Sequence, residues 1–162
     1  MGGSEMLATE ALAGEEDWPS IAARIAALTE GEDDAIAKMA TIACELFHSS
    51  GRFDWVGFYR NVGKETLKIG PYQGGHGCLV IPFSRGVCGA CATRRETIIV
   101  PDVDAFSDHI ACSSSTRSEI VLPVIVNGEL IGVLDIDSDR PDAFTQEDAA
   151  ALEAILAKAF GG

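Results

Sequence analysis

The sequence contains no long apolar run and only a small number of basic residues. No segment approaches the ~18 consecutive apolar residues that mark a transmembrane helix. Lys and Arg together number 12 against 25 Asp and Glu, which gives a net charge of −13. Nucleic acids and anionic membrane surfaces both bind through basic protein surfaces. The composition therefore predicts a protein that binds neither.

The sequence also lacks the marks of export and of dinucleotide binding. Residues 1–15 have neither the basic end nor the long apolar core of a signal peptide. We therefore expect a cytoplasmic protein whose five cysteines are kept reduced rather than used as structural disulfides. No Gly-x-Gly-x-x-Gly motif stands before a helix, which argues against a nicotinamide or flavin. We expect no bound cofactor.

The length and composition are those of one globular domain. The chain has 162 residues, of which 47% are hydrophobic and 23% are charged. A chain of this length can bury most of its apolar surface in one core. Residues 1–16 are small, polar and acidic, and they are expected to form a mobile N-terminal tail. Residues 17–162 are expected to form a single domain.

Helices are expected near both ends of this domain, with strands between them. The first two helices, at about 18–30 and 33–49, follow the helical period of apolar residues. Their expected buried stripes are Ile21, Ile25 and Leu28, and then Ile36, Met39, Ala40, Ala43 and Phe47. Strands are expected at about 54–60, 65–69, 76–83, 97–100, 118–126 and 129–137. This pattern predicts an α+β fold, with a central antiparallel sheet of five or six strands flanked by helices from both chain ends.

Two local signals fix the C-terminal part of this pattern. Asn127-Gly128 is a strong signal for a two-residue hairpin turn between the last two strands. Thr145 is expected to begin the last helix, because Asp148 stands where a capping box requires an acidic side chain.

Four of the five cysteines lie within 35 residues, and carboxylates follow them closely. The cysteines are Cys78, Cys88, Cys91 and Cys112, and the hairpin after them carries Glu119, Asp135 and Asp137. Asp135 and Asp137 are two apart on a strand and so point to the same face. Crowded carboxylates in a pocket raise one another's pKa. The fifth cysteine, Cys44, is expected to be buried on its helix as a small apolar side chain.

These residues are compatible with a metal site or with a thiol-redox site. Three short pairings offer zinc ligands: His76-x-Cys78, Cys88-x2-Cys91 and His109-x2-Cys112. A structural zinc site usually has two closely spaced pairs, whereas Cys78 and Cys112 stand alone. A thioredoxin-like role for Cys88-x2-Cys91 lacks the βαβ context of that motif. We therefore favour thiol chemistry and expect no metal.

The motifs between residues 76 and 138 resemble those of one family. They are Gly-Cys78-x3-Pro82-x3-Gly86-Val-Cys88-Gly, Asp102-Val-x-x-Phe-x-x-His109-Ile-Ala-Cys112, Ser118-Glu119-Ile-Val-x-Pro123 and Ile131-Gly-Val-Leu-Asp135-Ile-Asp137-Ser138. Upstream, Trp55-x-Gly57-Phe-Tyr59 belongs to the same pattern. Together they resemble the free methionine-(R)-sulfoxide reductases, which are small stand-alone GAF-domain enzymes. The resemblance covers roughly residues 35–160.

The resemblance implies a GAF-like catalytic domain that reduces free L-methionine-(R)-S-oxide to L-methionine. Cys112 would be the nucleophile, left as a sulfenic acid after its attack. Cys78 would be the resolving cysteine, with Cys88 as an alternative resolving residue or relay. Thioredoxin, or dithiothreitol in vitro, would reduce the resulting disulfide, and the protein would be a homodimer. Cys91 departs from the family pattern and is assigned no role.

The remaining site residues are expected to bind the substrate. Glu119 and Asp137 are candidate proton donors to the sulfoxide oxygen. Together with Asp135, they are also candidate partners for the ammonium group of a free amino acid. Trp55 and Tyr59 share a face of their strand; with the resemblance, Trp55 is a candidate wall for the sulfoxide methyl group and Tyr59 a neighbour in the same pocket. Backbone amides of residues 113–118 are candidate donors to the substrate carboxylate.

One alternative function is compatible with the same fold but involves no catalysis. A GAF domain can be a non-enzymatic module that binds a small molecule and acts as a sensor. No output domain or long coiled-coil linker accompanies the domain, which argues against a sensor. Incubation with methionine-(R)-sulfoxide and dithiothreitol distinguishes the two, because only the enzyme releases methionine.

Overall fold

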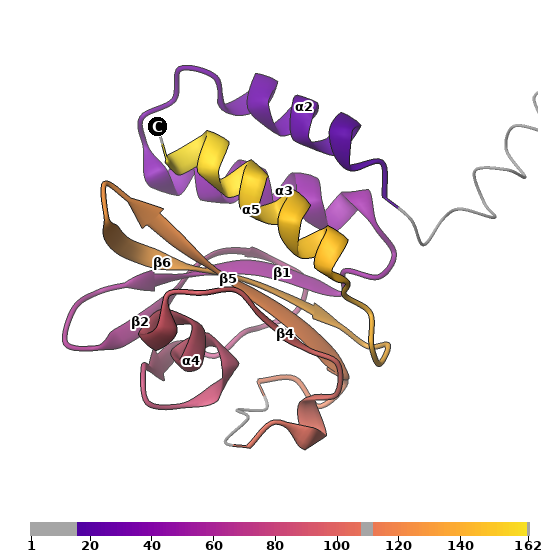
Figure 1. Cartoon of the computed structure of the whole chain (residues 1–162). Helices are drawn as coiled ribbons and strands as arrows, with labels where there is room; N and C mark the ends of the chain where they lie inside the picture. The colour runs from indigo at the N-terminus through magenta and orange to yellow at the C-terminus, as the bar shows by residue number, and fades with distance from the viewer. Residues whose placement is uncertain (1–15, 108–111, 162) are drawn as a thin grey trace, which may run out of the picture.

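The core of the protein is a six-stranded antiparallel sheet in the order β3-β2-β1-β6-β5-β4 (Figure 1). It is seen in a computed structural model that describes residues 16–107 and 112–161. The strands are β1 (Trp55–Asn61), β2 (Thr66–Gln73), β3 (Val80–Pro82), β4 (Ile98–Val100), β5 (Ser118–Val126) and β6 (Glu129–Ser138). The expected α+β class and antiparallel sheet are confirmed.

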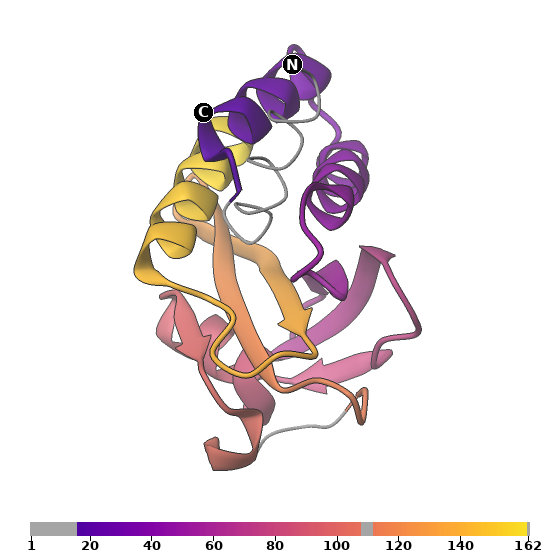
Figure 2. The ribbon, with the colours of Figure 1, turned by 90° about the vertical axis from the view of Figure 1, so that its right-hand side faces the viewer.

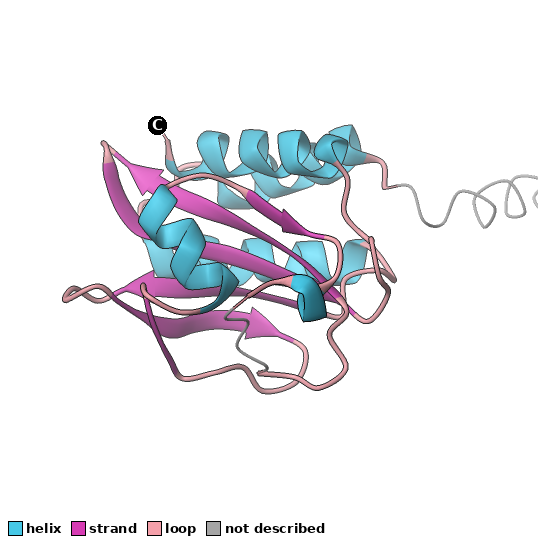
Figure 3. Cartoon of the chain, turned by 60° about the horizontal axis from the view of Figure 1, so that its bottom comes forward, coloured by secondary structure: helices cyan, strands magenta, loops and turns pink. Residues whose placement is uncertain are grey.

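Helices cover both faces of the sheet, but unequally. α2 (Trp18–Thr29), α3 (Ala35–Ser49) and α5 (Gln146–Phe160) lie together on one face, so both chain ends contribute to one layer (Figures 1 and 2). The short helix α4 (Gly86–Arg94) lies on the other face, in front of the strands in Figure 3. A 3-10 turn at Val103–Ala105 follows β4 on the way to β5.

The alternation of side chains along the central strands separates two cores. Val56 and Phe58 of β1 face the three-helix layer, whereas Trp55 and Tyr59 face the α4 side. On β6, Ile136 likewise packs in the three-helix core. Asp135 and Asp137, on either side of Ile136 along the strand, therefore point to the opposite face, the α4 side. The face covered only by one short helix is the face that carries the carboxylates.

The local signals at the turns and caps are confirmed. Asn127 and Gly128 both have positive φ angles, of 51° and 79°, as the two-residue turn between β5 and β6 requires. Thr145 and Asp148 form the expected capping box at the start of α5. Asp17 caps α2 by accepting a hydrogen bond from the Ser20 amide.

The expected buried stripes of the first two helices are partly wrong. Leu28 and Ile36 are 60% and 46% exposed, and Ala40 is also exposed. Helix α2 instead buries Thr29, and α3 buries Ile42 and Leu46. Helix α2 packs on α3 and α5, and α3 packs on both α2 and the sheet, so the neighbouring helix helps to decide which residues of each stripe are buried.

The expected strand at 76–83 is also shorter than the sequence suggested. Only Val80–Pro82 pairs with β2, while the preceding residues leave the sheet and bring Cys78 to Cys112. In compensation, β2 runs on to Gln73, beyond the expected end at residue 69.

A buried ionic network joins the two chain ends behind the sheet. Arg52 is 8% exposed and donates hydrogen bonds to both carboxylate oxygens of Asp148, at 3.0 and 3.2 Å. It also pairs with Glu16, which the sequence placed in the tail, while residues 1–15 lie outside the described residues. No helix within residues 16–107 and 112–161 is both long and apolar enough to cross a membrane.

Candidate active site

A cavity opens on the α4 face of the sheet, between the strand ends, the first turn of α4 and the segment that follows Cys112. Its volume is about 30 Å³, which accommodates a water molecule or two but not an amino acid. The lining residues come from four parts of the chain: Tyr59, Ile81, Gly86, Val87, Cys88, Cys112, Ser113, Thr116, Glu119, Asp135 and Asp137. Two sulfur atoms and three carboxyl groups thus share one small cavity.

The three carboxylates are brought together by strand register. Glu119 on β5 lies directly opposite Asp137 on β6, and Asp135 is two residues away on the same face of β6. Glu119 and Asp135 are 6% and 4% exposed. One oxygen each of Asp135 and Asp137 is buried without a hydrogen-bond partner among the described residues.

Burial controls the protonation of the two aspartates. It raises the pKa of Asp135 well above its ordinary value, and the neighbouring Asp137 and Glu119 raise it further. Burial also raises the pKa of Asp137, and the charge of Glu119 adds to this. Like charges in a dry site disfavour ionisation, so burial and crowding favour the protonated form of both aspartates. The site can therefore donate a proton to a ligand oxygen.

Cys78 and Cys112 are joined in a disulfide at the edge of the cavity. Their Cα atoms are 5.3 Å apart, within the usual range for a disulfide. Cys112 is exposed and Cys78 is half-buried. The spacing of 34 residues had left open whether Cys78 or Cys88 lies within reach of Cys112, and the structure pairs Cys112 with Cys78.

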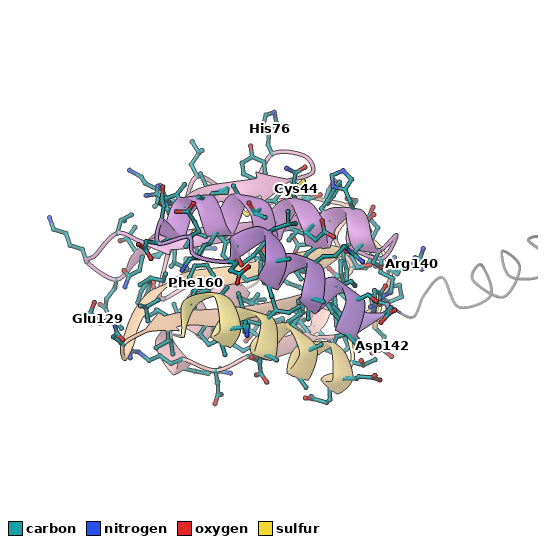
Figure 4. All side chains as sticks on the ribbon, turned by 90° about the horizontal axis from the view of Figure 1, so that it is seen from above. Cys44, His76, Glu129, Arg140, Asp142 and Phe160 are labelled. Carbon is teal, nitrogen blue, oxygen red and sulfur yellow. A yellow bond between two sulfur atoms is a disulfide. The ribbon has the colours of Figure 1, made fainter. Side chains whose placement is uncertain are left out.

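The other cysteines differ in their surroundings. Cys88 lines the cavity from the first turn of α4, and burial followed by the charge of Asp135 raises the pKa of its thiol. Cys91 is fully buried one turn further along α4, and burial raises its pKa as well. Cys44 was expected to be buried but is exposed on α3 (Figure 4), with its Sγ atom 3.8 Å from Nδ1 of His48. The face of α3 that carries Cys44 turns to solvent rather than to the sheet.

The two candidate aromatic residues have different positions. Tyr59 lines the cavity, while Trp55 lies behind it and is absent from the lining among the described residues. The Trp55 ring stacks on Tyr59 at 5.8 Å and on Tyr72 at 5.4 Å. Its Nε1 donates a hydrogen bond of 2.8 Å to the Gly75 carbonyl. Trp55 thus supports the wall that Tyr59 presents.

The structure does not gather the zinc ligands suggested by sequence spacing. Cys78 and Cys112 bond to each other, and His76 projects from the rim of the molecule (Figure 4). His109 lies outside the described residues. The group able to hold a cation in residues 16–107 and 112–161 is instead Cys88, Glu119 and Asp135, with ligand atoms within 4.8 Å of one another. The carboxyl oxygens of this group can also accept hydrogen bonds from an ammonium group.

Three residues of the cavity wall were not assigned to the site from the sequence: Ile81, Gly86 and Val87. Gly86 has a φ of 71°, which favours glycine, and it lets α4 begin directly at the cavity. The N-cap residue, Arg85, makes no side-chain capping bond. The sequence feature that could have identified this part of the cavity wall is the glycine at the start of an expected helix.

Comparison with known proteins agrees with this geometry. Residues 33–159 match the model of the GAF domain. The chain is 41% identical over 132 residues to free methionine-R-sulfoxide reductase of Escherichia coli (strain K12), covering 82% of this chain and 79% of that protein. It is 38% identical over 135 residues to the Saccharomyces cerevisiae protein of the same name, with coverages of 79% and 75%.

A solved structure extends the similarity to three dimensions. Free methionine-R-sulfoxide reductase from Neisseria meningitidis, in complex with its substrate, matches with a TM-score of 0.83 and 40% identity. The match covers 88% of this chain and 85% of that one. The chain therefore belongs to the GAF domain family and, within it, to the free methionine-(R)-sulfoxide reductases.

Proposed function

We propose that this protein reduces free L-methionine-(R)-S-oxide to L-methionine with its own cysteine thiols. The observation that carries the proposal is the placement of the Cys78–Cys112 pair beside a cavity with three buried carboxyl groups. A thiol can attack the sulfoxide sulfur only if the oxygen gains protons as it leaves. Asp135 and Asp137, whose pKa values are raised by burial, lie at the same site and can supply them.

The reaction begins with attack by the Cys112 thiolate on the sulfoxide sulfur. The S–O bond breaks, the oxygen and a proton end on Cys112 as a sulfenic acid, and methionine leaves. Asp137 donates the proton, with Glu119 opposite it in the same register. The Cys78 thiol then attacks the sulfenic acid, which forms the disulfide and releases water. Cys88 lines the cavity but stands outside the observed disulfide, so it serves as the reserve resolving thiol.

Two groups recognise the substrate as a free amino acid. Its ammonium group binds among Glu119, Asp135 and Asp137. The backbone nitrogen of a peptide-bound methionine sulfoxide carries no charge and does not bind there. Its carboxylate accepts hydrogen bonds from backbone amides of the 113–118 segment, of which Ser113 and Thr116 line the cavity. The uncapped first turn of α4 provides a second set of amides. Tyr59, held by Trp55, forms the wall beside the methyl group.

Thioredoxin, or dithiothreitol in vitro, returns the disulfide to two thiols. The deciding experiment measures methionine release from four substrates, namely the free and peptide-bound forms of each sulfoxide epimer. We expect wild-type protein to act on the free R epimer only and Cys112→Ser to be inactive. A protein that binds a small molecule tightly and releases no methionine is the sensor module instead.

A further inference from the structure

Three potential metal ligands converge on the cavity from different parts of the fold. Cys88 lies in the first turn of α4, Glu119 on β5 and Asp135 on β6, and all three are buried. A sulfur or oxygen atom of each lies within 4.8 Å of those of the other two. Because no two of them are close in the sequence, the spacing of ligands along the chain did not indicate this group.

One oxygen atom of this group has no partner within the protein. Oδ1 of Asp135 is buried without a hydrogen-bond partner among the described residues, and the side chain lines the cavity. A buried polar atom without a partner is costly. In native structures such an atom usually has an explanation, and an ion or a water molecule is a common one. This oxygen is therefore open to a ligand that enters the cavity.

The size of the cavity and the types of donor atom select the ion. A volume of about 30 Å³ holds a metal ion with a water molecule but not an amino acid. A thiolate together with carboxylates suits zinc, which accepts both kinds of ligand in proteins. Magnesium and calcium bind oxygen ligands, so the sulfur atom disfavours them.

Small side-chain movements are enough to bind zinc. Its bonds to sulfur are about 2.3 Å long and those to oxygen about 2.0–2.2 Å, so the ligand atoms of a tetrahedral site lie about 3.3–3.6 Å apart. Atoms that already lie within 4.8 Å of one another reach these separations by moving about 1 Å. The position of Cys88 in the first turn of a helix also favours its thiolate.

We propose that Cys88, Glu119 and Asp135 form an inhibitory binding site for Zn²⁺. The metal replaces the thiol proton of Cys88, which passes to solvent, and a water molecule supplies the fourth ligand. Zinc here is a reversible competitor and not a resident cofactor. The substrate ammonium group uses the same carboxylates, so zinc and the sulfoxide exclude each other. This exclusion rests on the proposed function, whereas the metal binding does not.

The binding test uses oxidised protein, because the disulfide removes the thiols of Cys78 and Cys112 as ligands. Cobalt(II) is the probe, since a thiolate ligand gives it a sulfur-to-cobalt charge-transfer band. We expect wild type to show this band, and zinc but not magnesium to displace the cobalt. Cys88→Ser is expected to lose the band and to bind zinc more than about 100-fold more weakly, since even outer-shell partners of a metal contribute about 10–100-fold. Asp135→Asn is expected to keep the band and to bind zinc at least about tenfold more weakly.

Two other cysteines provide matched controls. Cys44→Ser removes an exposed thiol that lies 3.8 Å from His48 and can bind metal with it. Cys91→Ala removes a buried thiol one turn further along α4, which does not belong to the group. Both variants are expected to keep the band and the wild-type affinity for zinc. A wild-type spectrum without the band, or a band that Cys44→Ser abolishes, overturns the proposal.

Inhibition is measured on reduced protein in a single turnover, after removal of the reductant, because dithiols chelate zinc. We expect zinc to slow methionine release from wild type and Cys44→Ser in competition with the free sulfoxide. Cys88→Ser is expected to need more zinc for the same inhibition, by the factor found for binding. Equal sensitivity of Cys88→Ser and wild type assigns the ion to the thiols of Cys78 and Cys112 and overturns the proposal. If wild type releases no methionine at all, the proposed function fails, and the cobalt spectra still decide the metal site.

Discussion

Glu119 on β5 lies directly opposite Asp137 on β6, and this single pairing brings carboxylates from two strands into one buried site. Asp135 joins them from the same face of β6. Such a group is costly when ionised, because each carboxylate has been removed from water and faces like charges. The raised pKa values of the two aspartates favour their neutral form, which lowers this cost, and the site faces a cavity.

The raised pKa of Asp135 predicts a pH-dependent effect of Asp135→Asn on stability. Burial raises the folded pKa of Asp135 above its unfolded value of about 3.9. The folded wild type thus holds a proton that the unfolded chain loses as pH rises above about 4. Wild-type stability therefore falls relative to the neutral asparagine variant, by at most about 1.4 kcal/mol per pH unit. The two proteins are expected to be closest in stability near pH 4.

Urea unfolding from pH 4 to pH 8 measures this difference. Glu129→Gln is the control, because Glu129 is an exposed carboxylate at the far end of the same strand (Figure 4). A stability difference between Asp135→Asn and wild type that stays constant with pH would show that Asp135 is not protonated in the folded protein.

The cysteine assignments predict three distinct phenotypes with methionine-(R)-sulfoxide. Cys112→Ser is expected to release no methionine. Cys78→Ser is expected to release one equivalent per chain quickly and then to accumulate a sulfenic acid on Cys112, since only the reserve thiol of Cys88 remains and its raised pKa leaves little thiolate. Cys88→Ser keeps the observed disulfide pair and is expected to continue turnover with dithiothreitol.

Mass spectrometry after trapping with dimedone identifies the sulfenic acid, and non-reducing peptide mapping identifies the disulfide. If Cys88→Ser rather than Cys78→Ser accumulated the sulfenic acid, the two cysteines would have to exchange roles.

The small cavity predicts that substrate binds to the reduced protein and not to the oxidised one. The cavity beside the Cys78–Cys112 disulfide has a volume of about 30 Å³, too small for an amino acid. Calorimetry with the free R sulfoxide on Cys112→Ser, which cannot form the disulfide, is expected to give binding. The oxidised wild type is expected to give none. Equal affinities would mean that the disulfide does not restrict the cavity.

The sequence placed the carboxylates on the sheet more accurately than it placed the buried faces of the helices, for physical reasons. Asp135 and Asp137 could be placed on one face because the strand repeat of two leaves no ambiguity once the hairpin at Asn127 is recognised. Leu28 and Ile36 were misplaced because the helical repeat allows a wide stripe, and the neighbouring helix decides which side of the stripe is buried.

Contacts between segments that are far apart in the sequence cannot be predicted from the helical or strand repeat. The pairing of Cys112 with Cys78 rather than Cys88 depends on how residues 76–79 leave the sheet, which no local pattern specifies. The position of Trp55 behind Tyr59 depends on its hydrogen bond to the Gly75 carbonyl and on stacking with Tyr72. The network of Arg52 was missed because its partners, Glu16 and Asp148, are far from it in the chain.

Arg52→Met is expected to destabilise the fold by about 3–5 kcal/mol, since it leaves the buried carboxylate of Asp148 without its cation. Burial alone would raise the pKa of Asp148, but hydrogen bonds from Arg52, Thr145 and Trp18 outweigh it and lower that pKa. A lowered folded pKa gives stability that is present above the unfolded value of about 3.9 and is lost as pH falls below it. The stability advantage of wild type over Arg52→Met should therefore shrink as pH falls below about 4.

In urea unfolding at pH 7, adding Asp148→Asn to Arg52→Met should recover part of the loss, because the uncompensated charge is removed. If Asp148→Asn instead lowered the stability of Arg52→Met by as much as it lowers that of wild type, that result would mean that the two side chains do not interact.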